Sequence, residues 1–466
     1  MSSRPSPNLG AEPWCEPTTS LAGDGGCKTV AVIRTRRGPN LATRLAALSA
    51  GVVVVCSGCV GAYEVTTEDK SDHAALQVAT ADATSGEAEA ADAPAGPPEQ
   101  SSTDPATDGD DPAVIDSTVE AAAPAVLHPV PSDQRQMAKL SVITDGPLTP
   151  KSVEASANGL FFAQNMMYSH TITVYDRSFA LVKSIPDSIN PADWGYPDHA
   201  GTTTGSPVEM AFSHDGTKAY VSNYEMSGPG FSNPGNDKCS KGSWDNSYLY
   251  RVDTASLEID QVIEVGPVPK YVAVTPDDAT VLTTNWCGYD LSVVDAATGK
   301  ETRRIPIGRF PRGIAVMPDN TTVFVAVMGT KDIAVVNLVD DSVQWITGVG
   351  QGPRHLVLDP AGEFLYATLN GEGKVAKIDV ATRTVVAKVA SPSQPRSMTI
   401  APDGRSLYVV NYDSDAVSKI RTSDMTQIQR LPTGHHPIGI TYDRTDNRVW
   451  VACYGGSLYV FDDTAS

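Results

Sequence analysis

Proline recurs at one fixed interval in the second half of the chain. Five prolines are separated by 42 residues each: Pro269, Pro311, Pro353, Pro395 and Pro437. A second series keeps the same step at Pro276, Pro318, Pro360 and Pro402. Self-similarity at such a period is typical of architectures in which every repeat forms one supersecondary unit. This part of the chain must therefore fold as a series of equivalent units.

Each unit contains several short strand patterns. From Pro311 the chain reads P-R-G-I-A-V, T-V-F-V-A-V, D-I-A-V-V-N and S-V-Q-W-I-T-G, with turn-forming residues between these runs. Short runs of β-branched residues bounded by turn formers predict β-strands. Four strands in about 40 residues are the pattern of a β-propeller blade.

The number of blades follows from counting units outward. Pro207 opens P-V-E-M-A-F and Pro150 opens P-K-S-V-E-A, so the chain contains seven units. The intervals 150–207 and 207–269 exceed 42 residues, and we assign the excess to loops because loops tolerate insertions better than strands. The sequence predicts an all-β fold over residues 137–466, a seven-bladed β-propeller of four-stranded antiparallel blades.

The seventh unit lacks a fourth strand pattern. The segment K-L-S-V-I-T-D-G at residues 139–146 stands before the first unit in the way that an outer strand precedes the other units. A ring whose last blade is completed by an N-terminal strand has no exposed sheet edge at its junction. We expect this strand to close the seventh blade in the antiparallel sense.

The second-strand phrases S-L-Y-V-V-N-Y, F-L-Y-A-T-L-N, K-A-Y-V-S-N-Y and R-V-W-V-A-C-Y resemble the YVTN family of β-propeller repeat proteins. The resemblance covers about residues 137–466. Blade 4 departs from it with V-F-V-A-V, and blade 7 has Cys453 in place of the asparagine. The resemblance implies a propeller that is exported or displayed at a bacterial or archaeal surface, in a family in which many members have no assigned activity.

A basic stretch followed by an apolar run predicts an export signal within residues 1–59. The run at residues 45–55 is long enough for a signal-peptide core and too short to span a bilayer. Ser57 and Gly58 before Cys59 resemble a bacterial lipobox, although Cys56 stands where an aliphatic residue is usual. We predict lipidation at Cys59 and a membrane anchor; an ordinary secretory signal is the alternative.

An acidic, low-complexity segment follows. Residues 61–130 contain fifteen acidic residues and one basic residue, Lys70, among Ala, Thr, Ser, Pro and Gly. Such a composition buries too little apolar surface to offset its chain entropy, so residues 60–136 are predicted to be a disordered linker. With a formal net charge of −20, the chain is not expected to bind nucleic acid.

Cysteine usage agrees with export. Cys239 lies in the blade 2 insertion and Cys287 follows the second strand of blade 3, so loops of adjacent blades bring them near one another. A disulfide between Cys239 and Cys287 is one prediction, and two free thiols are the alternative. Cys453 falls inside a strand, where a buried, inert thiol is expected.

The residue after each blade-opening proline is usually cationic. These residues are Lys151, Lys270, Arg312, Arg354 and Arg396, with Val208 and Ile438 in the other two blades. They predict a positive ring at the channel mouth that would bind carboxylate or phosphate. The alternative is structural, with each cation bonding carbonyls of the neighbouring blade and sealing the ring.

Other candidate binding residues lie in the same loops. We include His436 in the crossover into blade 7, together with Trp286 and Trp244, whose rings suit a sugar or a protein partner. The histidine spacings match no metal motif, so we predict no metal. We also predict no cofactor, because the sequence contains neither a Walker loop nor a dinucleotide glycine signature. No catalytic residue is identified.

These observations predict a non-catalytic binding module at the cell envelope, lipid-anchored or periplasmic. Its expected partner is a small anionic ligand, a glycan or an envelope protein, and the expected state is a monomer. The alternative, drawn from similar propellers, is a lactonase-like hydrolase or a dehydrogenase-subunit-like propeller acting on a small anionic substrate. A purely architectural surface protein is a third hypothesis.

Overall fold

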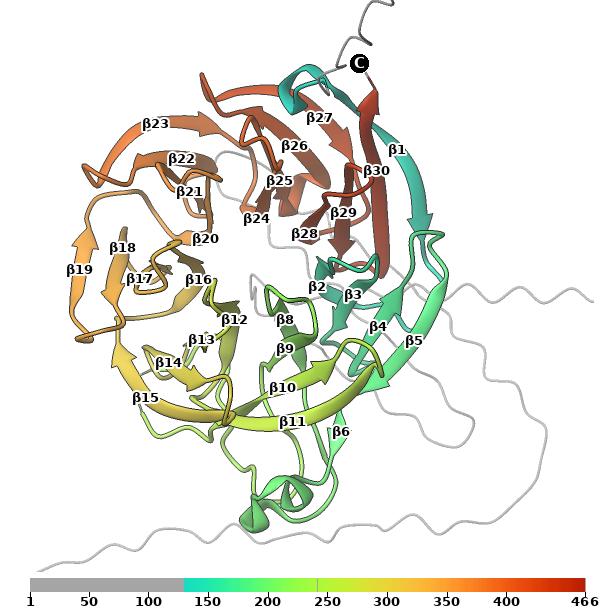
Figure 1. Ribbon diagram of the computed structural model, residues 1–466, viewed down its shortest axis with the longest axis vertical. Helices are drawn as coiled ribbons and strands as arrows, with labels where there is room; N and C mark the ends of the chain where they lie inside the picture. The colour runs from blue at the N-terminus through green and yellow to red at the C-terminus, as the bar shows by residue number, and fades with distance from the viewer. Residues whose placement is uncertain (1–129, 241, 466) are drawn as a thin grey trace, which may run out of the picture. The chain divides into compact units, whose positions relative to one another are not determined.

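The computed structural model describes residues 130–240 and 242–465, which form seven four-stranded sheets arranged in a ring around one axis (Figure 1). All neighbouring strands within a sheet are antiparallel. The fold is therefore the predicted seven-bladed β-propeller. The predicted signal peptide, Cys59 and residues 60–129 of the predicted linker lie outside the described residues. The end of the predicted linker was wrong: Ser132 and Arg135 are buried against the propeller and Gln136 begins its first strand.

Blades 1 to 3 contain the following strands, in order from the channel outward. Blade 1 contains β2 (Pro150–Ala155), β3 (Phe161–Asn165), β4 (Thr171–Tyr175) and β5 (Leu181–Pro186). Blade 2 contains β8 (Pro207–Phe212), β9 (Lys218–Asn223), β10 (Ser247–Asp253) and β11 (Glu258–Val265). Blade 3 contains β12 (Pro269–Val274), β13 (Thr280–Asn285), β14 (Asp290–Asp295) and β15 (Lys300–Pro306).

Blades 4 to 6 repeat the same order. Blade 4 contains β16 (Pro311–Val316), β17 (Thr322–Val327), β18 (Asp332–Asn337) and β19 (Val343–Ile346). Blade 5 contains β20 (Pro353–Leu358), β21 (Phe364–Leu369), β22 (Lys374–Asp379) and β23 (Thr384–Ala390). Blade 6 contains β24 (Pro395–Ile400), β25 (Ser406–Asn411), β26 (Ala416–Arg421) and β27 (Thr426–Pro432).

Blade 7 joins the two ends of the described chain. It contains β28 (Pro437–Asp443), β29 (Arg448–Cys453), β30 (Ser457–Ala465) and, as its outer strand, β1 (Gln136–Ile143). β1 pairs with β30 in the antiparallel sense, as expected. The strand ends before the predicted residue 146 because Gly146 has a φ of 92° and belongs to the turn that leads into blade 1.

A buried polar network reinforces this closure. Lys419 and Asp463 are both fully buried and form an ion pair. Lys419 also donates a hydrogen bond of 2.9 Å to the carbonyl oxygen of Arg135, which directly precedes β1. Tyr408 OH donates to the second carboxylate oxygen of Asp463 at 2.5 Å. Blade 6, β30 and the N-terminal segment are thus joined by groups that would be costly to leave unpaired.

The hydrophobic core lies between adjacent blades. One cluster combines Phe324 and Val335 of blade 4 with Leu356 and Leu365 of blade 5. Between blade 7 and blade 1, Trp450 stacks on Phe161 with ring centroids 3.9 Å apart. Because each sheet buries both faces against its neighbours, the inner strands are held at fixed positions around the channel.

The recurring asparagine of the second strand has a structural role. Asn285 donates to Ser292 Oγ at 2.7 Å, and Asn411 donates to Ser418 Oγ at 2.9 Å, so each asparagine joins the second strand of its blade to the third. In blade 4 the corresponding residues are Val327 and Ala334, which instead lie in an apolar cluster. The asparagine and its partner are therefore replaced together.

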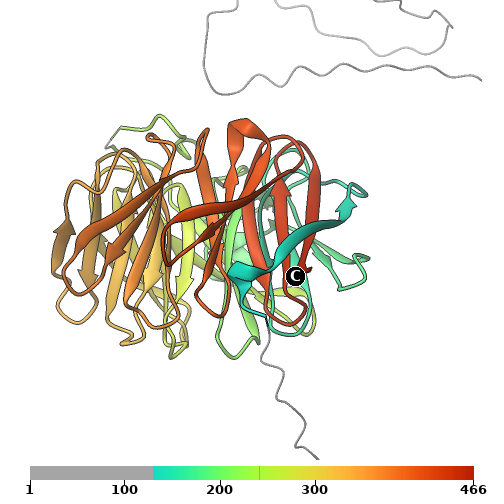
Figure 2. The ribbon, with the colours of Figure 1, turned by 90° about the horizontal axis from the view of Figure 1, so that it is seen from above.

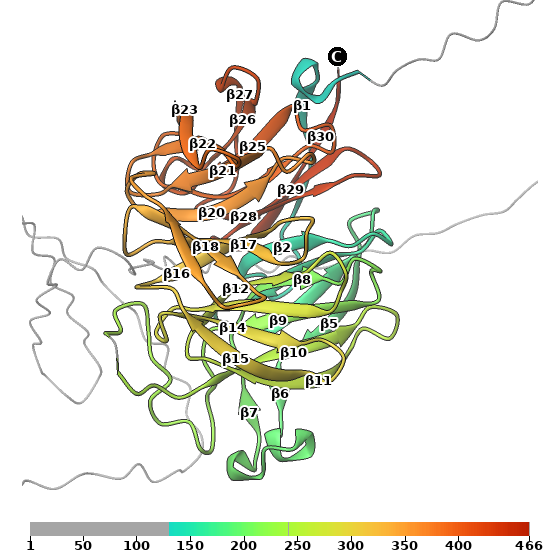
Figure 3. The same ribbon diagram turned by 60° about the vertical axis from the view of Figure 1, so that its left-hand side comes forward.

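Two insertions lie on the face where the inner strands begin, which we call the entry face. Residues 187–206 contain β6 (Ser188–Ile189), η2 (Pro191–Trp194), η3 (Pro197–His199) and β7 (Thr203–Thr204), and this hairpin projects from the ring (Figure 3). Residues 224–246 link β9 to β10, and Ser227 forms a β-bridge with Thr204. Two further short 3₁₀ helices are η1 (Ser132–Gln134) and η4 (Tyr412–Ser414).

Seen from its edge, the ring has its strands running between the entry face and the opposite face (Figure 2). Across the described residues, the structure contains no helix of sufficient length and apolar character to cross a membrane.

Deleting residues 137–146 should lower the melting temperature by on the order of 10 °C, because β30 then loses its antiparallel partner and a sheet edge is exposed. Thermal unfolding followed by circular dichroism measures the change. Leu140→Ser, which alters an exposed side chain of β1 and keeps its backbone, is the matched control and should change stability by at most about 0.5 kcal/mol. An unchanged melting temperature for the deletion would show that β1 does not stabilise the ring.

Candidate functional site

The residues after the blade-opening prolines meet at the mouth of the channel. Burial and the nearby charges of Arg312, Lys270, Arg396 and Arg354 together hold the pKa of Lys151 well below its usual value. Five cations from five blades are therefore close enough to repel one another. Lys270, Arg354 and Arg312 are 2%, 3% and 7% exposed. We call these five residues the cationic ring.

A backbone irregularity directs these side chains. In every blade the pairing of the first two strands shifts just after the proline, for example between Pro269 and Tyr271 and between Pro311 and Ile314. Such bulges re-aim the side chain that follows. The residue before the proline is left-handed in five blades, at Val268, Phe310, Gly352, Gln394 and His436. This conformation is uncommon before proline and was not predicted.

Lys270 has protein partners. Its Nζ lies 2.6 Å from Asp237 Oδ1, 4.0 Å from the centroid of the Tyr224 ring and 5.2 Å from that of Trp286. Burial lowers the pKa of Lys270 to about 8, against the opposing effect of Asp237. Burial would raise the pKa of Asp237, but Lys270 outweighs it and keeps this carboxylate ionised. One cation of the ring is thus already neutralised.

Asp237 reaches the ring on the 224–246 insertion, which a disulfide fastens to blade 3. Cys239 and Cys287 form a disulfide, which confirms one of the two predicted alternatives. Trp286 Nε1 donates to the carbonyl oxygen of Asp237 at 3.2 Å, and Tyr289 OH donates to that of Cys239 at 3.1 Å. The insertion is thereby held against the mouth.

Arg312 and Arg354 differ from Lys270. Glu209 is the carboxylate that forms an ion pair with Arg312: its Oε1 lies 4.0 Å from Nη2, and this buried Nη2 has no hydrogen-bond partner among the described residues. Within the same residues, neither arginine side chain donates a hydrogen bond to a carbonyl of a neighbouring blade. The geometry therefore does not support a sealing role for these two arginines.

The remaining two cations rest on aromatic rings. The Arg396 guanidinium lies 3.6 Å from the Tyr412 centroid and donates to Gln394 Oε1 at 3.1 Å. Lys151 Nζ lies 5.3 Å from the Tyr454 centroid. Both contacts place the cation over the negative face of an aromatic ring.

Below the ring, the channel contains titratable side chains that no sequence motif had predicted. Burial raises the pKa of Glu209 to about 7 against the opposing effects of Arg312, Arg354 and Lys151. Burial and the neighbouring Glu209 raise the pKa of Glu154 well above its usual value. The third residues of the inner strands are all polar or small: Ser152, Glu209, Tyr271, Gly313, His355, Ser397 and Gly439. Comparing the third residue of the inner strand across all seven repeats would have singled out Glu209.

A cavity of about 460 Å³ continues the channel towards the opposite face, and residues from all seven inner strands line it, including Glu154, Tyr271 and His355. Tyr271 OH lies 3.4 Å from His355 Nε2. Burial and the charges of Arg354 and Arg312 lower the pKa of His355 to about 3, so this imidazole is neutral. The channel thus has a cationic mouth and a largely neutral, hydrogen-bonding interior.

The other predicted binding residues pack against the protein. Trp286 stacks on Phe310 with centroids 4.4 Å apart, and Trp244 Nε1 donates to the carbonyl oxygen of Ser240 at 2.9 Å. His436 is stacked between Tyr412 and His435, with centroids 4.1 and 3.6 Å away. Trp286 therefore packs against Lys270, and His436 reaches the ring indirectly, through the Tyr412 ring that also contacts Arg396.

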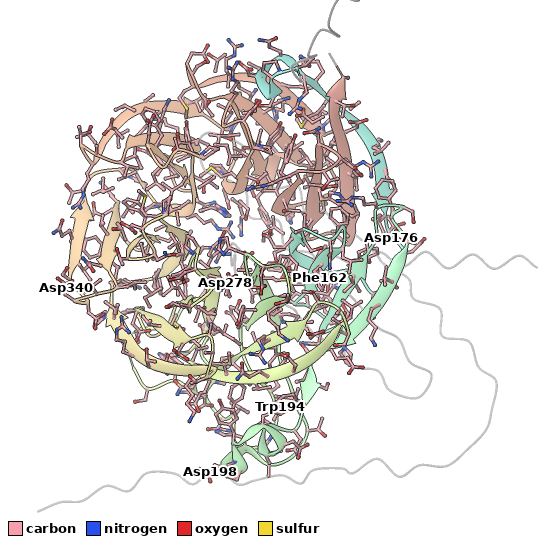
Figure 4. The ribbon with its side chains drawn as sticks, viewed as in Figure 1. Phe162, Asp176, Trp194, Asp198, Asp278 and Asp340 are labelled. Atoms are coloured by element: carbon pink, nitrogen blue, oxygen red, sulfur yellow. A yellow bond between two sulfur atoms is a disulfide. The ribbon has the colours of Figure 1, made fainter. Side chains whose placement is uncertain are left out.

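The projecting hairpin lies apart from the mouth. Trp194 and Asp198 are seen at the outer perimeter of the molecule, on the segment that projects from the ring (Figure 4). Trp194 packs with Tyr248 and Tyr250 of blade 2. Among the described residues, no group of three or more His, Cys, Asp or Glu side chains is arranged to hold a metal ion.

Neither a protein-family model nor a curated protein sequence matches the chain. A solved structure to which it is similar is hydrazine synthase from Kuenenia stuttgartiensis, with a TM-score of 0.55 and 17% identity, covering 69% of this chain and 98% of that chain. Similarity at this identity shows a shared fold. The chain is thus a seven-bladed β-propeller; its membership of the YVTN repeat family stays a prediction.

Proposed function

We propose that this propeller is a binding module that takes a small anion, a carboxylate or a phosphate, at its cationic ring. The observation that carries the proposal is the state of Arg312 and Arg354. Both guanidinium groups are buried at the mouth, and the nearest carboxylate, Glu209, stands 4.0 Å from Arg312 without a hydrogen bond. Buried guanidinium groups without bonded counter-charges favour an external anion.

The charge balance supports an anion over a neutral ligand. Asp237 neutralises Lys270, and Glu209 offsets part of one arginine. The ring retains an excess of positive charge although the whole chain carries a formal net charge of −20. Since Lys270, Arg312 and Arg354 are buried, the field of this excess is concentrated at the mouth. A glycan or an envelope protein that presents an acidic group would satisfy the same requirement.

We also propose export, with a lipid anchor at Cys59 and residues 60–129 as the tether to the cell envelope. The basic stretch, the apolar run 45–55 and the small residues before Cys59 support this proposal. The disulfide between Cys239 and Cys287 suits an oxidising compartment. Kinship with the YVTN repeat family would agree with this location.

A second candidate function is catalytic, as a hydrolase or a dehydrogenase subunit acting on a small anionic substrate. One observation favours it: Glu209, whose pKa is raised to about 7, lies directly beside the guanidinium groups that would hold the substrate. A carboxyl group with that pKa is suited to general acid–base chemistry. Turnover of lactones or hydroxy acids by the purified protein separates this function from simple binding.

Replacing both Arg312 and Arg354 by alanine should weaken the binding of sulfate and of lactate by roughly tenfold or more, because a hydrogen bond to a charged group contributes about 1.5–3 kcal/mol. Isothermal titration calorimetry measures the affinity. Arg421→Ala, which removes a surface arginine paired with Asp424, is the control and should bind as the wild type does. A lower melting temperature with unchanged anion affinity would instead support the sealing role.

Anion affinity should fall as the pH rises from 6 to 7.5. Glu209 is protonated and neutral below its pKa of about 7, so the net positive charge at the mouth is greatest there. Its protonated fraction decreases about fourfold over this interval, which sets the expected loss of sulfate affinity. Glu209→Gln should flatten the dependence. The comparison stops at pH 7.5 because Lys270, with a pKa of about 8, also loses its charge above that pH.

Export and anchoring are tested in a bacterial host that processes lipoproteins. Metabolic labelling with a radioactive fatty acid should label the full chain, and Cys59→Ser should abolish the label and release the protein from the membrane fraction. Cys56→Ser is the matched control and should remain labelled. Release of an unlabelled mature protein from the wild type would support the ordinary secretory signal instead.

A further inference from the structure

Lys151 is a lysine surrounded by cations. It extends from β2 into the cationic ring, where Arg312, Lys270, Arg396 and Arg354 are the charges that act on it most strongly. Within the described residues, its ammonium group forms no ion pair and donates no hydrogen bond, and it lies 5.3 Å from the centroid of the Tyr454 ring. Burial and these neighbouring charges therefore make the neutral amine more populated here than at an exposed lysine.

Lys270 provides an internal comparison, because it occupies the same position in blade 3. Its ammonium group lies 2.6 Å from Asp237 and 4.0 Å from the centroid of Tyr224. Its pKa is lowered to about 8, whereas that of Lys151 is held well below its usual value. The same blade position thus contains one paired lysine and one lysine whose positive charge lacks a bonded partner.

Two acidic groups also face this part of the mouth. The positive charge of Lys151 lowers the pKa of Glu209 on β8 and of Asp237 on the 224–246 insertion. Asp237 forms an ion pair with Lys270, and Glu209 forms one with Arg312. Neither carboxylate bonds Lys151, so neither one holds its proton in place. Glu209, with a pKa of about 7, is a group at the mouth that changes its protonation near neutral pH.

A neutral lysine amine beside other cations is a nucleophile towards carbonyl groups. The arginines next to it would hold a carboxylate by paired hydrogen bonds. A ligand that satisfies both groups carries a carboxylate and an adjacent carbonyl carbon, which is the structure of a 2-oxo acid. One carboxylate offsets only one guanidinium, so the remaining cations continue to favour the neutral amine.

We propose that Lys151 binds small 2-oxo acids covalently, as a reversible imine formed inside the cationic ring. This inference rests on the anion-binding function proposed above and names the ligand class of the same site. The Lys151 nitrogen attacks the carbonyl carbon and forms the C–N bond. The carbonyl oxygen leaves as water after taking up two protons, one from the nitrogen and one from solvent, so the product is the protonated imine and no atom changes oxidation state overall. Hydrolysis restores the free lysine and the free acid.

The test is reductive trapping on the purified full chain. The protein is incubated with pyruvate at pH 7 and treated with sodium borohydride, which transfers hydride to an imine carbon and makes the bond permanent. Peptide mass mapping should then find the adduct at Lys151, enriched on the order of tenfold or more over other lysines, since each unit by which a pKa falls raises the neutral amine fraction about tenfold. Lys270 serves as the comparison within the same sample.

Three controls make the result specific. Lactate, which has the carboxylate and lacks the carbonyl, should give no adduct. Propanal, which has the carbonyl and lacks the charge, should show no preference for Lys151. Lys151→Arg should abolish the pyruvate adduct, and Lys388→Arg, which alters a lysine paired with Glu372 outside the ring, should retain it.

The outcomes separate this inference from the function on which it rests. If calorimetry shows that the wild type binds lactate and pyruvate but borohydride traps nothing at Lys151, the anion site stands and the imine is wrong. If neither acid binds, both proposals fail. Labelling spread equally over Lys151, Lys270 and Lys388 also overturns the inference. Because trapping is mapped on the wild type, the test does not depend on the folding of any variant.

Discussion

The antiparallel pairing of β1 with β30 is the interaction on which the rest of the structure depends. It joins residues more than 300 positions apart and completes the seventh sheet. Once the ring is closed, the seven inner strands surround one axis at fixed positions. Side chains at equivalent positions of distant repeats must then converge. The cationic ring is therefore a consequence of closure: in an open array, Lys151 and Arg396 would lie at opposite ends.

Convergence has an electrostatic cost that the structure only partly offsets. The insertion at residues 224–246 brings Asp237 to Lys270, and the disulfide at Cys239 holds that insertion in place. Aromatic rings support Arg396 and Lys151, and Glu209 stands near Arg312 without a hydrogen bond. The uncompensated part of the ring lies away from Asp237, so the mouth is electrically asymmetric although the fold is pseudo-symmetric. Destabilisation that persists at a concave mouth is characteristic of a place where a ligand binds.

The periodic features of the fold were predictable because each repeats. The prolines set the start of every inner strand, and the missing outer strand of blade 7 required a substitute. The cations at the second position were predictable for the same reason. The rest of the site was not, because Asp237, Glu209 and Glu154 each occur in one blade and have no local motif. The left-handed residues before proline, such as Phe310 and His436, were also missed, since general preferences at that position favour extended backbone.

The paired replacement of Asn285 and Ser292 by Val327 and Ala334 limits how such repeats diverge. A buried asparagine needs an acceptor on the third strand: in blade 2, Asn223 donates to the backbone carbonyl oxygen of Tyr248 at 3.3 Å instead of to a hydroxyl. Gene conversion or duplication that copies a whole blade preserves both partners, whereas stepwise substitution passes through a mismatched intermediate. Blades of this propeller are thus expected to change this pair as a unit, either keeping an asparagine bonded to the third strand or replacing both positions with apolar residues.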